Sequence, residues 1–204
     1  PGGDMVSHLV GCSEVEPATL VANCIFLLYA GHETTTSLIA IGVLRLIQHP
    51  EQARLLREHP EHWSSAVEEC LRYDSPVAVT SRIVRVDCEI GGRRLCAGDH
   101  LDLDLGAANR DPRAFAAPER FDVQRAPNPH VAFGAGPHFC LGAALARAEA
   151  LIAIRACLER FPALRLVDPR PRWRPTVVFH GLESLAVEPA ESPNRPASES
   201  IAAV

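Results

Sequence analysis

The chain has 204 residues, enough for one domain with a sizeable hydrophobic core. With a formal net charge of −5 and a pI near 6.0, it lacks the basic character that nucleic-acid-binding proteins usually show. Its seven cysteines show no metal-cluster spacing, which favours a reducing, cytoplasmic compartment, and its 20 basic residues are all arginine, which points to high-GC bacterial coding.

The first part of the chain is predicted to be helical. We expect a short helix within residues 1–12, and a much longer one that begins near Pro17 and ends at Gln48, before His49-Pro50. At ~1.5 Å per residue the long helix would extend roughly 45 Å and form a central strut. Its apolar run at residues 20–30 has about half the length of a membrane span, so we expect no membrane contact.

The apolar run of the long helix breaks at AGHETTTS, residues 30–37. Inside a helix Gly31 costs about 1 kcal/mol relative to alanine, and three successive threonines add β-branched side chains that fit a helix poorly. A cluster of residues that disfavour the helix containing them often marks a functional site, and we expect the helix to widen or kink here. Taken alone, the segment also fits a polar patch that faces solvent.

Two further helices are predicted at 51–59 and 62–73. In the second one Glu69 and Arg72 are three residues apart and share a helix face. Such a pair is most often an exposed salt bridge worth a few tenths of a kcal/mol.

The middle of the chain changes from helical to extended patterns. Strands are expected at 77–86, 88–90, 93–96 and 100–105, with Gly91-Gly92 as a hairpin turn. A proline-rich connection follows at 106–132. Near the end we expect a hairpin formed by 177–179 and 184–187, and then a disordered tail at 188–204.

One cysteine lies in a glycine-rich loop, FGAGPHFCLG at residues 133–142, directly before a segment rich in helix formers. Cys140 is therefore at a helix N-terminus, where unpaired N–H groups and the helix dipole favour the thiolate, the form that binds metal. A lone thiolate fits a haem with one axial cysteine better than a zinc or iron–sulfur site, which recruits several ligands. Without these neighbours, a single cysteine would more often be a buried structural residue.

This loop resembles the haem-binding loop of the cytochrome P450 family, whose pattern is F-G-x-G-x-(H/R)-x-C-x-G. The matching positions are Phe133, Gly134, Gly136, His138, Cys140 and Gly142. The resemblance implies that the Cys140 thiolate is the axial iron ligand of a haem b. It also implies that Phe133 packs near the sulfur and that His138 lies beside a haem propionate.

The break in the long helix is similar to the family's oxygen-binding motif, (A/G)-G-x-(E/D)-T-T. By this resemblance Ala30 and Gly31 leave room for haem and dioxygen. Glu33 and Thr34 are implied to be the acid–alcohol pair that manages protons.

Glu69 and Arg72 resemble the family's E-x-x-R pair, whose partner is an arginine in a later proline-rich segment. In APERFD, residues 117–122, the matching arginine is Arg120. A carboxylate between two guanidiniums can be buried because planar donors match its charge. His130 resembles a residue that often joins this network, and the implied role of the whole network is structural.

The first predicted strand resembles the family's segment that lines the substrate pocket and supplies an arginine to a haem propionate. The matching position is Arg82, and Arg85 is the weaker alternative. The positions implied to line the substrate pocket are Tyr29, Val77, Ala78, Val79, Thr80 and His180.

Taken together, the resemblance implies a mainly α fold with small β-sheets (α+β), in which the long central helix packs over the haem-binding loop and its helix. Residues 1–187 would correspond to the C-terminal half of a single cytochrome P450 catalytic domain, so we expect the chain to be a fragment.

The implied function is a haem-dependent monooxygenase that inserts one oxygen atom of O2 into a small organic substrate. Its electrons would come from NAD(P)H through a ferredoxin and ferredoxin reductase, and we expect a monomer. One alternative is a peroxide-using haem enzyme, which needs no Glu33-Thr34 pair. A catalytically silent haem-binding protein, or an inactive truncated fragment, is the other.

Overall fold

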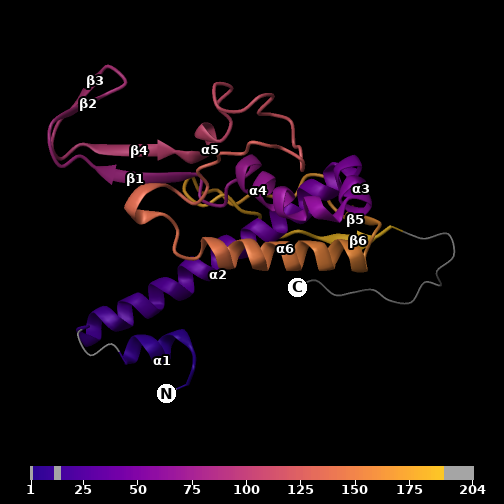
Figure 1. Cartoon of the computed structure of the whole chain (residues 1–204), viewed down its shortest axis with the longest axis horizontal. Coiled ribbons are helices and arrows are strands. Elements are labelled where there is room, and N and C mark those ends of the chain that lie inside the picture. The colour runs from indigo at the N-terminus through magenta and orange to yellow at the C-terminus, as the bar shows by residue number, and fades with distance from the viewer. Residues whose placement is uncertain (1, 12–14, 191–204) are drawn as a thin grey trace.

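The computed structural model describes residues 2–11 and 15–190. Its longest element is α2 (Pro17–Gln48), whose second half lies among the other helices while its first half projects outward near α1 (Met5–Val10) (Figure 1). Both helices begin at an acidic cap, because Asp4 accepts from the N–H of Ser7 and Glu16 accepts from that of Thr19. The predicted end of the long helix at Gln48 is confirmed.

The core forms where the second half of α2 meets the helices that follow it in the chain. These are α3 (Pro50–Glu58), α4 (Trp63–Tyr73) and α6 (Ala143–Arg160). Leu38 and Leu46 of α2 join Ile154 of α6 in one cluster of buried apolar side chains. Because a Cβ at Gly42 would collide with the end of the Ile154 side chain, this glycine is what lets α6 come so close to α2.

The first half of α2 leaves a stripe of apolar side chains exposed to solvent. Its large members, all more than half exposed, are Val21, Ile25, Phe26, Leu28 and Tyr29. By length and composition alone α2 would suffice to cross a membrane, a criterion that core helices of soluble proteins also meet. The buried residues of its second half are those of a core helix.

Three small antiparallel sheets complete the described chain. β1 (Val79–Ile83) pairs with β4 (His100–Asp104), and the hairpin of β2 (Cys88–Ile90) and β3 (Arg93–Leu95) lies between them in the chain. Both sheets extend to one side of the helices (Figure 1). The predicted turn between β2 and β3 is confirmed, since Gly91 and Gly92 have φ of +58° and +76°. The third sheet pairs β5 (Leu164–Leu166) with β6 (Val187–Pro189).

The prediction for the end of the chain is wrong in two respects. Residues 177–179 do not pair with 184–187; instead Phe179 forms an isolated bridge with Val77, and the strand at 187–189 pairs back to 164–166. The expected tail also begins too early, because Glu188 and Pro189 belong to β6. The rest of that tail, from 191 onward, lies outside the described residues.

Short helical segments connect the larger elements. They are η1 (Pro60–His62), α5 (Leu105–Ala108) and η2 (Gly136–His138). Between α5 and η2 the chain has no regular element, as predicted for the proline-rich connection. The fold is therefore mainly α with small β-sheets, as the sequence indicated.

Candidate functional site

The loop that contains Cys140 closes on itself just before α6. The Cys140 N–H donates to the carbonyl of Phe133 at 3.0 Å. Gly134 and Gly136 have φ of +72° and +74°, a conformation that side chains disfavour, so both positions require glycine. Cys140 itself is exposed, whereas Cys70 is buried and burial raises the pKa of its thiol. Cys140 therefore lies just before the N-terminus of α6 and is open to a ligand, whereas Cys70 is part of the core.

The surroundings of Cys140 fit a haem. Over residues 2–11 and 15–190, no group of three or more His, Cys, Asp or Glu side chains is arranged to hold a metal ion. Phe139 and Leu141, on either side of Cys140, are 51% and 89% exposed, and a Cβ at Gly142 would meet no atom within 4 Å. A single thiolate with apolar neighbours and open space suits a flat, hydrophobic macrocycle. His138 is also exposed in this loop.

Glu68 of α4 connects the cysteine loop to the helices behind it. Its carboxylate accepts from Arg147 Nε at 2.7 Å and Nη2 at 2.8 Å, and it lies 3.0 Å from His130 Nε2. Burial raises the pKa of Glu68, but the bonds to His130 and Arg147 outweigh burial and lower it to about 2. The Arg147 guanidinium also lies 4.5 Å from the centre of the Phe133 ring. His130 therefore contacts Glu68, not the Glu69 network that the resemblance implied.

Glu69 and Arg72 are fully buried and form a two-bond ion pair, with distances of 2.7 and 2.9 Å. The second guanidinium beside Glu69 is that of Arg125, whose Nε lies 3.1 Å from Oε2. Arg120 was predicted for this place, and the prediction is wrong. The Arg120 side chain is 68% exposed and faces Asp122, because the adjacent Phe121 is the side chain that enters the core.

Arg72 also ties the proline-rich connection to α4. Its Nη1 donates to the carbonyls of Asn109 and Pro118, at 2.9 Å each, and its Nη2 donates to that of Arg120 at 3.2 Å. Asp122 donates its N–H to Glu69 at 2.9 Å. Arg72 and Glu69 thus hold the proline-rich connection against α4, which is a structural role.

On α2 the residues of the predicted oxygen-binding motif remain in regular α-helix, so the expected widening does not occur. The Thr34 hydroxyl donates to the Ala30 carbonyl at 2.7 Å, which satisfies it within the helix. A Cβ at Gly31 would meet no atom within 4 Å, so the space beside this residue is open. Glu33 forms an ion pair with Arg174, a residue that the sequence did not single out.

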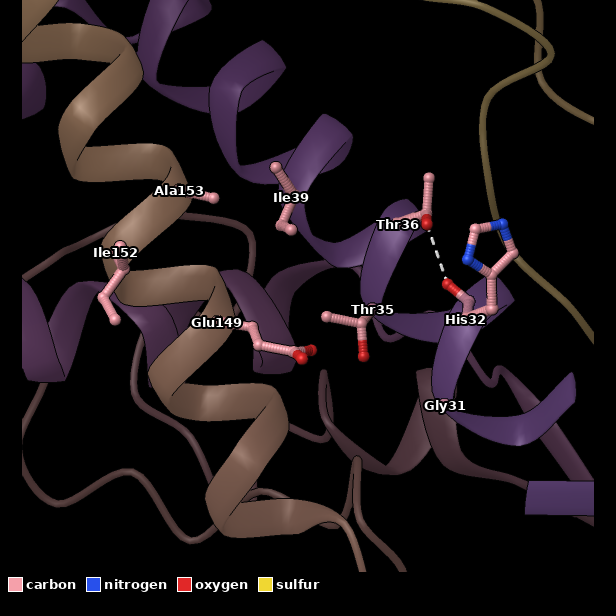
Figure 2. Close-up of a pocket in the computed structure, with 8 residues that line it drawn as sticks. All are labelled: Gly31, His32, Thr35, Thr36, Ile39, Glu149, Ile152 and Ala153. Carbon is pink, nitrogen blue, oxygen red and sulfur yellow. Dashed lines mark hydrogen bonds between the residues drawn. The ribbon is translucent and has the colours of Figure 1, made fainter. Parts of the chain in front are cut away.

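An open pocket of about 430 Å³ lies between α2 and α6 (Figure 2). Gly31 and Thr35 line it from α2, and Glu149 reaches toward Thr35 from α6 (Figure 2). Glu33 and Thr34 are not among its lining residues. The pocket therefore adjoins the predicted motif through Gly31 but does not coincide with it. It also shows that the helix following Cys140 packs beside the helix that holds Gly31.

The implied substrate positions are partly brought together. The Tyr29 ring lies 6.0 Å from the Phe179 ring, nearly perpendicular to it, and Ala78 donates its N–H to the Val178 carbonyl at 2.9 Å. Val77 bridges to Phe179, while Val79 and Thr80 continue into β1. These contacts place the segment 177–179, which was predicted as half of a hairpin, beside the implied pocket positions.

The His180 ring is engaged elsewhere. It stacks on Trp173 with ring centres 4.2 Å apart, and its Nε2 lies 3.5 Å from Asp74 Oδ1. Phe179 is therefore the better candidate for the wall beside Tyr29. Arg82 is exposed on β1 and donates to the Ser81 carbonyl at 2.8 Å, so its contact with a propionate stays a prediction.

Known proteins similar to this chain share one family. The family model described as Cytochrome P450 matches residues 6–180. The biotin biosynthesis cytochrome P450 of Bacillus subtilis (strain 168) is 49% identical over 190 residues, covering 92% of this chain and 48% of that protein. The 6-deoxyerythronolide B hydroxylase of Saccharopolyspora erythraea is 40% identical over 194 residues, covering 92% and 48%.

Solved structures agree with these relatives. P450BioI, in complex with an acyl carrier protein ligated to hexadec-9Z-enoic acid, matches with a TM-score of 0.88 and 49% identity over 92% of this chain and 49% of its own. A myxobacterial cytochrome P450 in complex with myristic acid gives 0.89 and 42% identity over 94% and 49%. The chain thus spans about half the length of the relatives it matches. Through the matched family model, its relatives and its fold, the chain belongs to the cytochrome P450 family.

Proposed function

We propose that this chain forms the cysteine-ligand and oxygen-handling part of a haem-dependent monooxygenase, which inserts one oxygen atom of O2 into a small organic substrate. The observation that carries the proposal is the exposed Cys140 in its closed glycine loop, before a helix that packs along α2. Because relatives are about twice as long, the activity belongs to the whole protein that contains these residues.

Each residue of the site has a definite task in this proposal. The Cys140 thiolate would hold a haem b, with His138 and Arg82 toward its propionates, and the bound haem would supply the redox chemistry with dioxygen. Glu33 would take up protons from water and pass them toward Thr34. The Thr34 hydroxyl, which now donates to the Ala30 carbonyl, would turn to hand a proton onward.

The substrate class is inferred from the side chains near Tyr29. The Tyr29 and Phe179 rings pack against each other, and the adjoining Val178 is an exposed apolar residue, which favours a substrate with a hydrocarbon skeleton. One relative is named for hydroxylation of 6-deoxyerythronolide B, and P450BioI was solved with a hexadec-9Z-enoic acid ligated acyl carrier protein, which supports a substrate of this kind. We infer that electrons arrive from NAD(P)H through a ferredoxin and ferredoxin reductase, and that the protein is a cytoplasmic monomer.

The proposal is tested with the haem-loaded protein under isotopically labelled dioxygen. With NAD(P)H, a ferredoxin and its reductase, the product found in a screen of fatty acids and 6-deoxyerythronolide B is expected to contain one labelled oxygen atom. Turnover with added hydrogen peroxide alone, and none with the electron donors, would instead support the peroxide-using alternative. Mass spectrometry of the product distinguishes the two.

Thr34→Ala is expected to lower the fraction of electrons that ends in product by at least ~10-fold, with the remainder released as hydrogen peroxide, because a positioned proton donor is lost. Thr36→Ala is the matched control, since the Thr36 hydroxyl makes the same kind of bond, to the His32 carbonyl at 2.8 Å. Product and peroxide are measured together against NAD(P)H consumed. Equal coupling in the two variants would remove Thr34 from the proton path.

A further inference from the structure

One loop near the end of the chain, residues 172–183, contacts α2 on three successive turns. Phe179 meets Tyr29, and Arg174 pairs with Glu33. One turn later, Gly181 approaches Ser37 so closely that a Cβ there would lie 2.6 Å from the Ser37 hydroxyl oxygen and would force that side chain to move. Positions spaced by four residues share one face of a helix, so the loop covers a single face of α2 from Tyr29 to Ser37.

Arg174 is fixed within this loop from several directions. Its backbone N–H donates to the Gly181 carbonyl at 2.9 Å, and its side-chain Nε donates to the Leu182 carbonyl at 3.1 Å. The neighbouring Trp173 bridges to Leu182. These bonds leave the Nη1 end of the guanidinium directed at Glu33. The arginine is therefore aimed by the loop and is not a freely moving surface charge.

Glu33 depends on this arginine for its balance of charge. Its Oε1 atom is shielded from solvent and accepts no hydrogen bond of good geometry from the described residues, so the Arg174 guanidinium is what offsets it. Other titratable groups nearby are engaged or set apart: His180 lies beside Asp74, and His32 and Glu149 line the neighbouring pocket. Within the described chain, Arg174 is the one ionic partner of Glu33.

We propose that Arg174 is the positioning residue of the proton path: it holds the Glu33 carboxylate ionised against the loop, and Glu33 leaves it only when protonated. A proton taken from water neutralises Glu33 and ends its attraction to Arg174. The neutral acid is then free to rotate and give that proton toward Thr34, after which the restored carboxylate returns to the guanidinium. The inference rests on the proposed function and adds the residue that governs it.

The charge of Arg174 should set the pH range in which the path works. A cation in contact favours the ionised carboxylate, so its removal lets Glu33 hold a proton at higher pH. In Arg174→Gln the pH above which coupled product formation declines is therefore expected to rise by about one unit, given that both side chains are partly exposed. Arg174→Lys keeps the positive charge and is expected to return this pH to the value of the unaltered protein. Arg172 is an exposed arginine of the same segment, so Arg172→Gln is expected to leave this pH unchanged.

A second measurement does not require turnover. In thermal unfolding of the haem-loaded protein, Arg174→Gln and Glu33→Gln are expected to lower the midpoint individually, and the double variant by less than their sum, because both remove one contact. Additive losses would show that the pair does not exist in solution.

The outcomes separate the two hypotheses. If the unaltered protein inserts no labelled oxygen, the proposed function fails, whatever the unfolding cycle gives. If it does insert oxygen, but Arg174→Gln and the unaltered protein share one pH profile, the positioning role of Arg174 is overturned. A shifted profile that Arg174→Lys does not restore would also overturn it, since the loss would then reflect the shape of the loop and not its charge.

Discussion

Cys140→Ala is expected to abolish both the thiolate-type carbon monoxide difference spectrum and all product formation. The reason is that the loop closed by the Cys140 N–H presents this one sulfur in front of α6, and the proposed haem has it as its only cysteine ligand. Soluble protein should still be obtained, because an exposed side chain contributes little to the core. Spectra of the reduced, carbon-monoxide-treated protein and the labelled-oxygen assay measure the two losses.

Cys96→Ala is the matched control, because Cys96 is also an exposed free cysteine but lies between β3 and β4, in a different part of the fold. It is expected to keep the spectrum and the activity of the unaltered protein. A thiolate-type spectrum that survives in Cys140→Ala would assign the iron to another cysteine and remove the basis of the proposed site.

Arg72→Ala is expected to lower the free energy of unfolding by about 3–5 kcal/mol, because Glu69 would remain buried beside an emptied site. The same change leaves the carbonyls of Asn109, Pro118 and Arg120 without their donor. A loss of this size is a large share of the ~5–15 kcal/mol that stabilises a domain, so much of the protein should fail to load haem. Urea unfolding followed by the haem absorbance measures the change.

Two other arginines provide the comparison that sharpens this prediction. Arg125→Ala is expected to be strongly destabilising, since Arg125 is 9% exposed and contacts Glu69. Arg120→Ala should change the unfolding free energy by less than ~0.5 kcal/mol, because that side chain is 68% exposed. Equal costs for Arg120→Ala and Arg125→Ala would mean that the ion network is arranged differently from the geometry described above.

The helices could be predicted from local patterns. Pro17 and His49-Pro50 delimit α2, and Gly91-Gly92 places the β2–β3 turn, because each signal acts on neighbouring residues only. The pairing of β5 with β6 was missed because it joins segments far apart in the chain, and the alternation of Leu164, Arg165 and Leu166 is too short to identify a strand.

The ligand loop and the motif on α2 could likewise be found from sequence, whereas their supporting contacts could not. Arg120 and Arg125 are both arginines of one proline-rich segment, and which of them reaches Glu69 depends on the burial of Phe121 and on the path of the backbone. Arg174 gave no signal, because a loop without a periodic pattern does not reveal which side chains face a distant helix. Residues 177–179 were predicted as a strand, but the contact of Phe179 with Tyr29 was not.

The single loop that meets Tyr29, Glu33 and Ser37 has a consequence for engineering this protein. Phe179 would contact the proposed substrate, so changing the loop at Phe179 to admit a bulkier molecule should also displace the Arg174 guanidinium. In the proposed enzyme, the same loop would therefore affect both which substrate is accepted and how many electrons reach product. Variants selected for a new substrate should also be assayed for hydrogen peroxide released per NAD(P)H consumed.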